Sequence, residues 1–351
     1  MNIKNQKLVS IIMNCYNSEK YLKQAIDSVL NQSYNSWELI IWDNKSTDNT
    51  SLIANSYDDN RIKYFLAENF SPLGEARNMA IKKSTGEIII RVDGHSIIHY
   101  DYVSKCKQQL NLKNCACVGG LIQPLGNSIF TKIITLATSS KFGVGNSKFH
   151  YSKNSCWSDT VYLGAYKREI FEKIGGYDEE LVRNQDDEFN FRLIQNGWKI
   201  WLDPSIKSSY YPRDSFTKLF KQYFQYGFYK VRVMQKRKGL ASWRHVVPGL
   251  FALTLLFGLS IFLFTGNTIP ILSLCLPYLS FSLFATILES IKTPSNLISV
   301  MMLPITFFIL HISYGLGFLM GFIYFLPKWG DIIIKDAHFD KEQFTKNSNF
   351  L

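Results

Sequence analysis

The chain has 351 residues, enough for two domains or for one large domain with an appendage. It is basic, with a net charge of +11, but the charge is unevenly spread, because residues 246–326 contain only two charged side chains, Glu289 and Lys292. Core helices of a soluble protein rarely run that far without a charge, so the composition argues against a soluble protein and predicts membrane insertion.

The compartment of the front domain follows from its N-terminus and its cysteines. Met1–Leu8 is polar and has no apolar signal core, so we expect this domain to stay in the cytoplasm. A cytoplasmic domain keeps its thiols reduced, and the six cysteines show no paired spacing typical of a metal site. We therefore interpret them as small buried apolar residues.

Strands and helices are predicted to alternate through the first hundred residues. We expect strands at 8–13, 39–42, 62–66 and 87–92, and helices at 19–31, 51–57 and 74–84. Their spacing is typical of βαβ units and predicts a doubly wound, parallel or mixed sheet. No glycine fingerprint of dinucleotide-binding enzymes and no P-loop occurs, so those two classes lose their main support.

The pattern is weaker after residue 100. We expect strands at 119–122, 160–165 and 199–202, and helices at 169–174 and 187–195. Residues 126–158 are rich in Ser, Gly, Asn and Lys, which predicts long mobile loops of the kind that form substrate lids.

A basic segment precedes the apolar region. Between Arg213 and Arg244 there are nine basic residues and one acidic residue, a net charge of +8. Such a block beside a membrane span attracts anionic head groups, at about 1 kcal/mol per charge. Its position at the membrane border favours lipid over nucleic acid as the partner.

Three apolar segments follow, at 246–265, 269–288 and 298–326. Each is long enough to cross a bilayer as a helix, but Pro304 can split the third into an interfacial piece and a span. Three spans would place the polar tail outside, whereas an interfacial third segment would keep it inside. We thus expect a cytoplasmic domain over 1–212, a basic amphipathic membrane-border segment over 213–245, two or three transmembrane helices over 246–326 and a polar tail over 327–351.

Polar clusters lie where predicted strands end. Asp93-Gly94-His95 closes one strand and is either a polar turn or a pair of ligands for one hard cation. Each cluster alone could cap a helix, but four at one sheet edge favour a ligand site, because open α/β sheets bind ligands at that edge. The other clusters are Asn14–Asn17 with Glu19, Asp43 with Asp48, and Asn184–Glu188.

Several longer motifs carry a family resemblance. They include Ser10-Ile-Ile-Met-Asn-Cys-Tyr-Asn17, Glu38-Leu-Ile-Ile-Trp-Asp-Asn-Lys-Ser-Thr-Asp48 and Gly74-Glu-Ala-Arg-Asn78. In these motifs the chain resembles the family 2 inverting glycosyltransferases. Within that family, Arg91-Val-Asp-Gly-His95, Arg183-Asn-Gln-Asp-Asp-Glu-Phe-Asn190 and Gln222-Tyr-Phe-Gln-Tyr-Gly227 are most similar to the succinoglycan-type membrane enzymes. The resemblance covers about residues 8–326.

The resemblance implies a GT-A fold and a nucleotide-diphosphate sugar donor, and it suggests roles in donor binding for five residues. By position, Asp43 would hydrogen-bond the base, Asn17 and Glu19 would line the nucleoside pocket, and Arg77 would lie near the phosphates. Asp93 would ligate Mg²⁺ or Mn²⁺ bridging the diphosphate. A cation is needed because the leaving diphosphate gains negative charge as the glycosidic bond breaks.

The acceptor hydroxyl also needs a base. Asp186 matches the aspartate of the family's Glu-Asp motif, with Asp187 as the alternative. Because neighbouring carboxylates tend to raise one another's pKa, the acidic cluster around Asp186 suits a base. Two positions differ from the family: His95 replaces the second aspartate of the metal motif, which leaves the metal preference open, and Gln185 replaces the usual glutamate.

These features predict a metal-dependent inverting glycosyltransferase at the inner membrane of a bacterium. It would transfer a sugar, from a UDP-type donor, to a lipid-linked saccharide during exopolysaccharide, capsule or lipopolysaccharide synthesis, together with polysaccharide-assembly proteins. Gln225-Tyr226 lacks the arginine of processive synthases, which favours single transfers. The alternatives are a polyprenyl-phosphate glycosyltransferase, a short processive synthase, or a non-catalytic scaffold that binds sugar nucleotides.

Three aromatic or polar residues have two interpretations each. Trp198 and Trp201 can be stacking platforms for an acceptor sugar or parts of the core. His311 lies in an apolar segment, where it can be functional or can form a hydrogen bond between helices.

Overall fold

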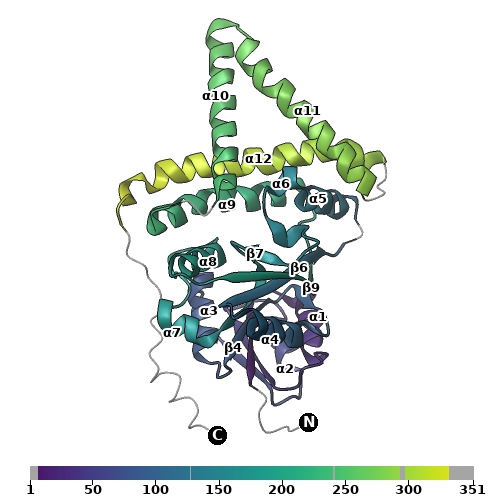
Figure 1. Ribbon diagram of the computed structural model, residues 1–351, viewed down its shortest axis with the longest axis vertical. Helices are drawn as coiled ribbons and strands as arrows, with labels where there is room; N and C mark the ends of the chain where they lie inside the picture. Colours follow the sequence, from purple (N-terminus) through teal and green to yellow (C-terminus); the bar gives the residue numbers. More distant parts are fainter. Residues whose placement is uncertain (1–6, 127, 240–241, 293–296, 332–351) are drawn as a thin grey trace. The chain divides into compact units, whose positions relative to one another are not determined.

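The computed structural model describes residues 7–126, 128–239, 242–292 and 297–331. These residues form two compact units (Figure 1). Of the described residues, the first unit contains those up to Gln123 and Ser152–Tyr211, and the second contains Pro124–Tyr151 and those from Pro212 to Asp331.

The first unit is built on a mixed sheet with the strand order β3-β2-β1-β4-β8-β6-β9-β5, and β7 pairs with β9. The strands β3, β2, β1 and β4 are parallel, whereas β8, β6, β9, β5 and β7 join through antiparallel pairs. The prediction of a doubly wound, mixed sheet is confirmed. The strands are β1 (Val9–Cys15), β2 (Trp37–Asp43), β3 (Ile62–Leu66), β4 (Ile88–Asp93), β5 (Ser96–Ile98), β6 (Cys117–Pro124), β7 (Cys156–Ser158), β8 (Tyr162–Lys167) and β9 (Ile200–Tyr210).

Six helices of the first unit pack around this sheet. The predicted helices are present, and α4 is an addition that the sequence pattern does not reveal, because only four of its twelve residues are buried. The helices are α1 (Glu19–Leu30), α2 (Thr50–Asn55), α3 (Leu73–Lys82), α4 (Tyr102–Lys113), α7 (Arg168–Ile174) and α8 (Gln185–Gln195).

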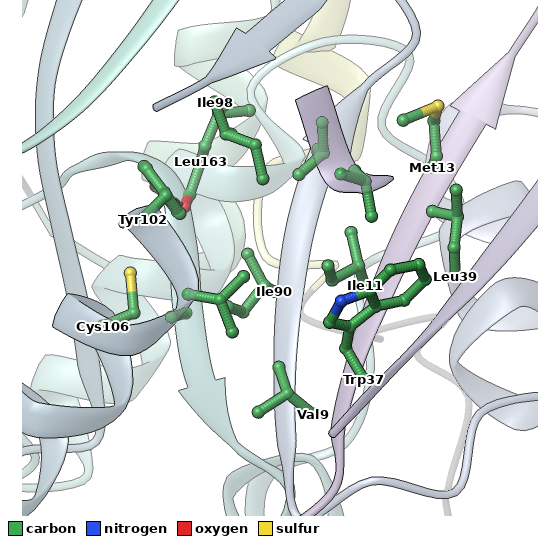
Figure 2. Close-up of a cluster of buried hydrophobic side chains, with 14 of the residues drawn as sticks. Val9, Ile11, Met13, Trp37, Leu39, Ile90, Ile98, Tyr102, Cys106 and Leu163 are labelled. Carbon is green, nitrogen blue, oxygen red and sulfur yellow. Dashed lines mark hydrogen bonds between the residues drawn. The ribbon is translucent and has the colours of Figure 1, made fainter. Parts of the chain in front are cut away.

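The core of the first unit lies between the sheet and two helices. Alternate residues of β1 point to one face, where side chains of β2, β4 and α4 join them (Figure 2). Side chains of α1 belong to the same cluster. Tyr102 of α4 is fully buried, and its hydroxyl donates to the carbonyl of Leu163 at 2.6 Å. Burial raises the pKa of the Cys15 and Cys106 thiols, which keeps them protonated and agrees with their interpretation as apolar core residues. The interpretation is wrong for Cys156 and Cys275, which are only partly buried.

The second unit is helical. The prediction of loops over 126–158 is wrong for much of that stretch, which contains α5, α6 and η2. Ile134 and Ala137 of α5 are buried in one cluster with Leu219 and Phe307, so a short apolar face inside a polar stretch is enough to order this helix. The elements are α5 (Ile129–Ser139), α6 (Lys141–Val144), η2 (Lys148–His150), α9 (Phe216–Arg237), η3 (Trp243–His245), α10 (Val247–Thr265), α11 (Ile269–Lys292), α12 (Leu297–Phe325) and η4 (Leu326–Lys328).

Three helices of the second unit, α10, α11 and α12, are long and apolar enough to cross a membrane. The predicted apolar segments are therefore confirmed as helices. Pro277 and Pro304 lie inside α11 and α12 without ending them. Pro304 thus does not split the third segment, as apolar helices tolerate proline where neighbouring groups compensate for the lost hydrogen bond.

Candidate active site

The predicted polar clusters meet at one edge of the sheet. In the parallel register, Asn14 of β1 pairs with Asp93 of β4, and Cys15 of β1 pairs with Asp43 of β2. The carboxyl ends of the three strands therefore lie at the same level. Asp43 and Asp93 are placed there by the fold itself, as the sequence predicts.

The loops after β1 and β2 hold each other through reciprocal hydrogen bonds. The Asn17 side chain accepts from the backbone N–H of Thr47 at 2.8 Å. The carboxylate of Glu19 accepts from the N–H of Asn49 at 3.1 Å, and Asp48 accepts from the N–H of Glu19 at 3.0 Å. Asn17 and Glu19 are solvent-exposed but bound to this neighbouring loop, so each has a structural role besides its predicted role in a nucleoside pocket.

The buried carboxylate of Asp43 fixes the loop that follows β2. Its side chain is fully buried, and its two oxygens accept from the N–H of Ser46 at 2.8 Å and from the hydroxyl of Tyr64 at 2.8 Å. Lys45 has a positive φ of 67°, which bends the chain over the carboxylate. These two partners of Asp43 are protein groups that fix the loop expected to contact the base.

Two aspartates and two arginines form the centre of the site. Arg91, in the middle of β4, donates to Asp93 at 3.0 Å through one terminal nitrogen and to Asp186 at 2.8 Å through the other. Arg77 of α3 lies 3.7 Å from the second oxygen of Asp93. Asp93 at the end of β4 and Asp186 in the first turn of α8 are therefore joined by one guanidinium.

This network determines the ionisation of both aspartates. Burial works to raise the pKa of Asp93 and of Asp186, but the charges of Arg91 and then Arg77 outweigh it, and both pKa values lie below their usual range. The prediction that neighbouring acids raise the pKa of Asp186 is wrong, because Arg91 lies against its carboxylate. Asp186 is consequently ionised at neutral pH.

Arg77 presents unused hydrogen-bond donors. Its residue surface is 3 % exposed, and two of its nitrogens, Nε and Nη1, have no hydrogen-bond partner. Burial and then the charge of Arg91 lower the pKa of its guanidinium. A buried cation with two open donors is suited to binding an anion, and the position of Arg77 near the donor phosphates stays a prediction.

The motif that contains Arg77 also fixes its helix. Asn78 is fully buried and exchanges hydrogen bonds with the backbone of Tyr177 in both directions, at 2.8 Å each. A Cβ atom at Gly74 would lie 2.4 Å from the carbonyl oxygen of Asp178. Gly74 therefore permits the close approach that Asn78 locks, and both set the position of Arg77.

The other two acids in the first turn of α8, Asp187 and Glu188, differ in their burial. Asp187 is half-buried in the first turn, beside Asp186. Glu188 is fully buried and forms an ion pair with Arg192 at 3.0 Å, so it is a structural residue. Gln185 is buried and donates to the carbonyl of Leu181 at 2.7 Å, which orders the turn before the helix.

The metal prediction rests on Asp93 and His95. His95 is exposed and follows Asp93 by two residues, across the buried Gly94. Within the described residues, no group of three or more His, Cys, Asp or Glu side chains is arranged to hold a metal ion. The assignment of Asp93 and His95 as ligands of one cation therefore stays a prediction.

The site residue that the sequence reasoning leaves without a role is Arg91. Its side chain is 7 % exposed although it lies in a strand of Ile and Val residues. An arginine inside a buried apolar strand needs a charged partner. This requirement is the feature of the sequence that could have pointed to Arg91 as a site residue. The partner on its own strand was visible in the sequence, but Asp186 lies 95 residues away.

For Trp201 and His311, each of which has two interpretations from the sequence, the structure favours one. Trp201 packs against the core cluster and meets Trp157 at a ring distance of 4.8 Å, which favours the core interpretation for Trp201. His311 of α12 bonds the hydroxyl of Tyr278 and the carbonyl of Phe142, both at 2.8 Å. Because both ring nitrogens are used between helices, the helix-to-helix interpretation is favoured for His311.

Comparison of the chain with known proteins identifies a family and several relatives. Residues 10–175 match glycosyl transferase family 2. Dolichyl N-acetyl-alpha-D-glucosaminyl phosphate 3-beta-D-2,3-diacetamido-2,3-dideoxy-beta-D-glucuronosyltransferase of Methanococcus voltae is 30 % identical over 327 residues, which are 90 % of this chain and 97 % of that protein. Succinoglycan biosynthesis protein ExoA of Rhizobium meliloti is 29 % identical over 248 residues, 68 % of this chain and 73 % of that protein.

Two further proteins are similar. UDP-Glc:alpha-D-GlcNAc-diphosphoundecaprenol beta-1,3-glucosyltransferase WfgD of Escherichia coli is 41 % identical over 90 residues, 26 % of this chain and 36 % of that protein. The structure of the mannosyltransferase PcManGT from Pyrobaculum calidifontis, in complex with GDP-Man and Mn²⁺, has a TM-score of 0.57 at 15 % identity and covers 91 % of this chain and 88 % of that one. This structural likeness shows a shared GT-A-like fold.

Proposed function

Since the chain belongs to glycosyl transferase family 2, we propose that it transfers a sugar, with inversion, from a nucleotide-diphosphate donor to a lipid-linked saccharide. The observation that carries the proposal is the match along 97 % of the Methanococcus relative, whose name describes transfer to a dolichyl-linked sugar phosphate. The name of the Escherichia coli relative likewise combines a UDP-sugar with a lipid diphosphate acceptor. The reaction would serve polysaccharide synthesis at the cytoplasmic face of a cell membrane.

Asp186 is the proposed base. Its side chain is 33 % exposed, so an acceptor hydroxyl can reach it, and its low pKa keeps it ionised. As the acceptor oxygen attacks the anomeric carbon, Asp186 takes the hydroxyl proton and the bond from that carbon to the diphosphate breaks. Asp187, in the same helical turn, is the alternative base.

Arg77 and Asp93 are the proposed binders of the leaving diphosphate. The two open donors of Arg77 supply hydrogen bonds that strengthen as negative charge develops on the leaving group. Asp93 and His95 would hold Mg²⁺ or Mn²⁺; the carboxylate of Asp93 suits both cations, whereas the imidazole of His95 suits Mn²⁺ better than Mg²⁺. The cation, when bound, would neutralise that same developing charge.

The proposal is tested with membranes that contain the full chain. They are incubated with a panel of nucleotide sugars, with and without Mg²⁺ or Mn²⁺, and with a lipid-linked saccharide, while release of nucleotide diphosphate is measured. We expect release from one donor class that depends on acceptor and cation, and its loss in Asp186→Asn. Wild-type turnover by Asp186→Asn would contradict the base assignment, and product length would separate single transfer from processive synthesis.

A further inference from the structure

We infer that α9 and α12 lie side by side on the surface of an anionic lipid bilayer, and that α10 and α11 are the two helices that cross it. The inference concerns the second unit alone and goes beyond the proposed reaction. It decides between the two topologies that the sequence leaves open.

The first observation is the close approach of α9 to α12 (Figure 1). A Cβ atom at Gly227 of α9 would lie 2.0 Å from the carbonyl oxygen of Tyr314. In the other direction, Cβ atoms at Gly317 and Gly321 of α12 would lie 2.0 Å and 2.4 Å from the carbonyl oxygens of Phe224 and Phe228. The two backbones are therefore in contact over more than one helical turn, which fixes the helices to each other.

The second observation is that this pairing continues to the ends of both helices. The side-chain amide of Gln235 donates to the carbonyl of Phe325 at 2.9 Å. Arg232 forms an ion pair with Asp331, just beyond α12, at 2.9 Å. Because later residues of α9 meet later residues of α12, the helices run in the same direction and share one inclination to the membrane.

The third observation is the charge of α9. This helix carries six basic residues and no acidic residue. Lys218 and Lys221 are exposed, whereas the other four are buried, namely Lys230, Arg232, Lys236 and Arg237. Charged side chains are costly inside a bilayer, so α9 cannot cross the hydrocarbon region, whereas anionic head groups attract it. Since α12 shares the inclination of α9, α12 does not cross either, despite its length and composition.

In contrast, α10 contacts α12 closely at its first turn, and most of its later residues are exposed. A Cβ atom at Gly315 of α12 would lie 2.2 Å from the carbonyl oxygen of Pro248, in the first turn of α10. Farther along, Phe257 and Leu263 are 67 % and 70 % exposed, as expected for side chains that face lipid. The chain returns through α11, whose Tyr278 bonds His311 of α12.

The exposed side of α12 fits the bilayer interface. It presents large apolar or amphipathic side chains rather than charges, and it is continuous with the spanning helices. Two crossings bring the chain back to its starting side, so the segments that enter α9 and leave α12 lie on one face of the membrane. The exposed residues of α12 include Met301, Met320, Ile323 and Tyr324.

The side of the membrane is tested by labelling single cysteines with an impermeant maleimide in intact and permeabilised cells. The background variant is Cys156→Ser with Cys275→Ser, because the other four cysteines are buried. Reporters are Lys45→Cys in the first unit, Asn267→Cys between α10 and α11, and Trp329→Cys after α12. We expect Trp329→Cys to label with Lys45→Cys and opposite to Asn267→Cys. Labelling of Trp329→Cys together with Asn267→Cys would overturn the inference.

Depth in the bilayer is tested with spin labels on the full chain in vesicles that contain anionic phospholipid. Labels at Met301, Met320 and Ile323 of α12 should all report one shallow depth. Labels at the exposed positions Leu253, Phe257 and Leu263 of α10 are the matched control and should report different depths, with Phe257 nearest the bilayer centre. A depth profile along α12 that passes through the centre would overturn the inference.

Discussion

At the scale of single residues, Arg91 connects the proposed cation-binding residue with the proposed base. It touches Asp93, the proposed cation ligand, and Asp186, the proposed base, at 3.0 Å and 2.8 Å. We expect Arg91→Met to lower kcat by about 100-fold, as for loss of one preorganised charged donor, because both carboxylates lose their orienting partner. Arg91→Lys keeps the charge and should recover part of the activity.

The pH dependence separates this role from a purely structural one. In the wild type, the pKa of Asp186 is held below its usual range, so turnover should not fall through loss of the base between about pH 7 and pH 5. In Arg91→Met, the pKa of Asp186 rises, so the acid limb of kcat should move to higher pH. An unchanged acid limb in a folded Arg91→Met protein would contradict the proposed electrostatic role.

A second prediction at this scale concerns Glu19, which is exposed but accepts two hydrogen bonds from Asn49. Glu19→Ala should reduce the free energy of unfolding by about 1 kcal/mol, since a typical hydrogen bond contributes about that much. Chemical denaturation measures this loss. If Glu19 also lines a nucleoside pocket, the KM for the donor rises in Glu19→Ala; an unchanged KM would leave it with the structural role alone.

At the scale of elements, α3 shows how a glycine positions a distant charge. A Cβ atom at Gly74 would collide with the backbone of Asp178, so Gly74→Ala must push α3 away from that segment and move Arg77. We expect a loss of about 1–3 kcal/mol in stability, typical of overpacking, and a higher KM for the donor. The control is Gly197→Ala, where nothing lies within 4 Å and only the positive φ of 82° opposes the substitution. A donor KM that rises equally in both variants would contradict this role of α3.

Regular elements of the first unit were predictable because their pattern is local. The strands β1, β2 and β4 are short apolar runs between helices with a clear apolar face, and their parallel register alone brings Asp43 and Asp93 together. By contrast, α4 buries few residues, and α5 gains its order from α9 and α12, which follow it by many residues. The contact between Arg91 and Asp186 likewise depends on packing between distant segments, which no local pattern encodes.

At the scale of the whole molecule, the second unit combines two separate stretches of the described chain, Pro124–Tyr151 and Pro212 to Asp331. His311 connects them through the carbonyl of Phe142 in α6. Periodicity within one segment cannot reveal such an assembly. This is why composition predicted loops where the structure has helices that pack against the apolar region.

The last prediction concerns the basic segment and lipid. Lys236 and Arg237 are 3 % and 8 % exposed, so reversing their charge would disturb packing, whereas Lys218, Lys221 and Lys238 are exposed. In the triple variant of these three lysines to Glu, we expect turnover with a lipid-linked acceptor in anionic vesicles to fall at least about five-fold, the effect of losing a single surface charge that contributes about 1 kcal/mol.

Three controls test whether that loss comes from the membrane surface. Hydrolysis of the donor without acceptor should be unchanged in the triple variant, since these lysines lie outside the proposed active site. The same lysines changed to Arg should behave like the wild type, because the charge is kept. In vesicles of neutral lipid, the wild type and the triple Glu variant should become similar, as the attraction between α9 and the head groups is then absent. An equal loss in acceptor turnover and donor hydrolysis would contradict a role of α9 at the anionic surface.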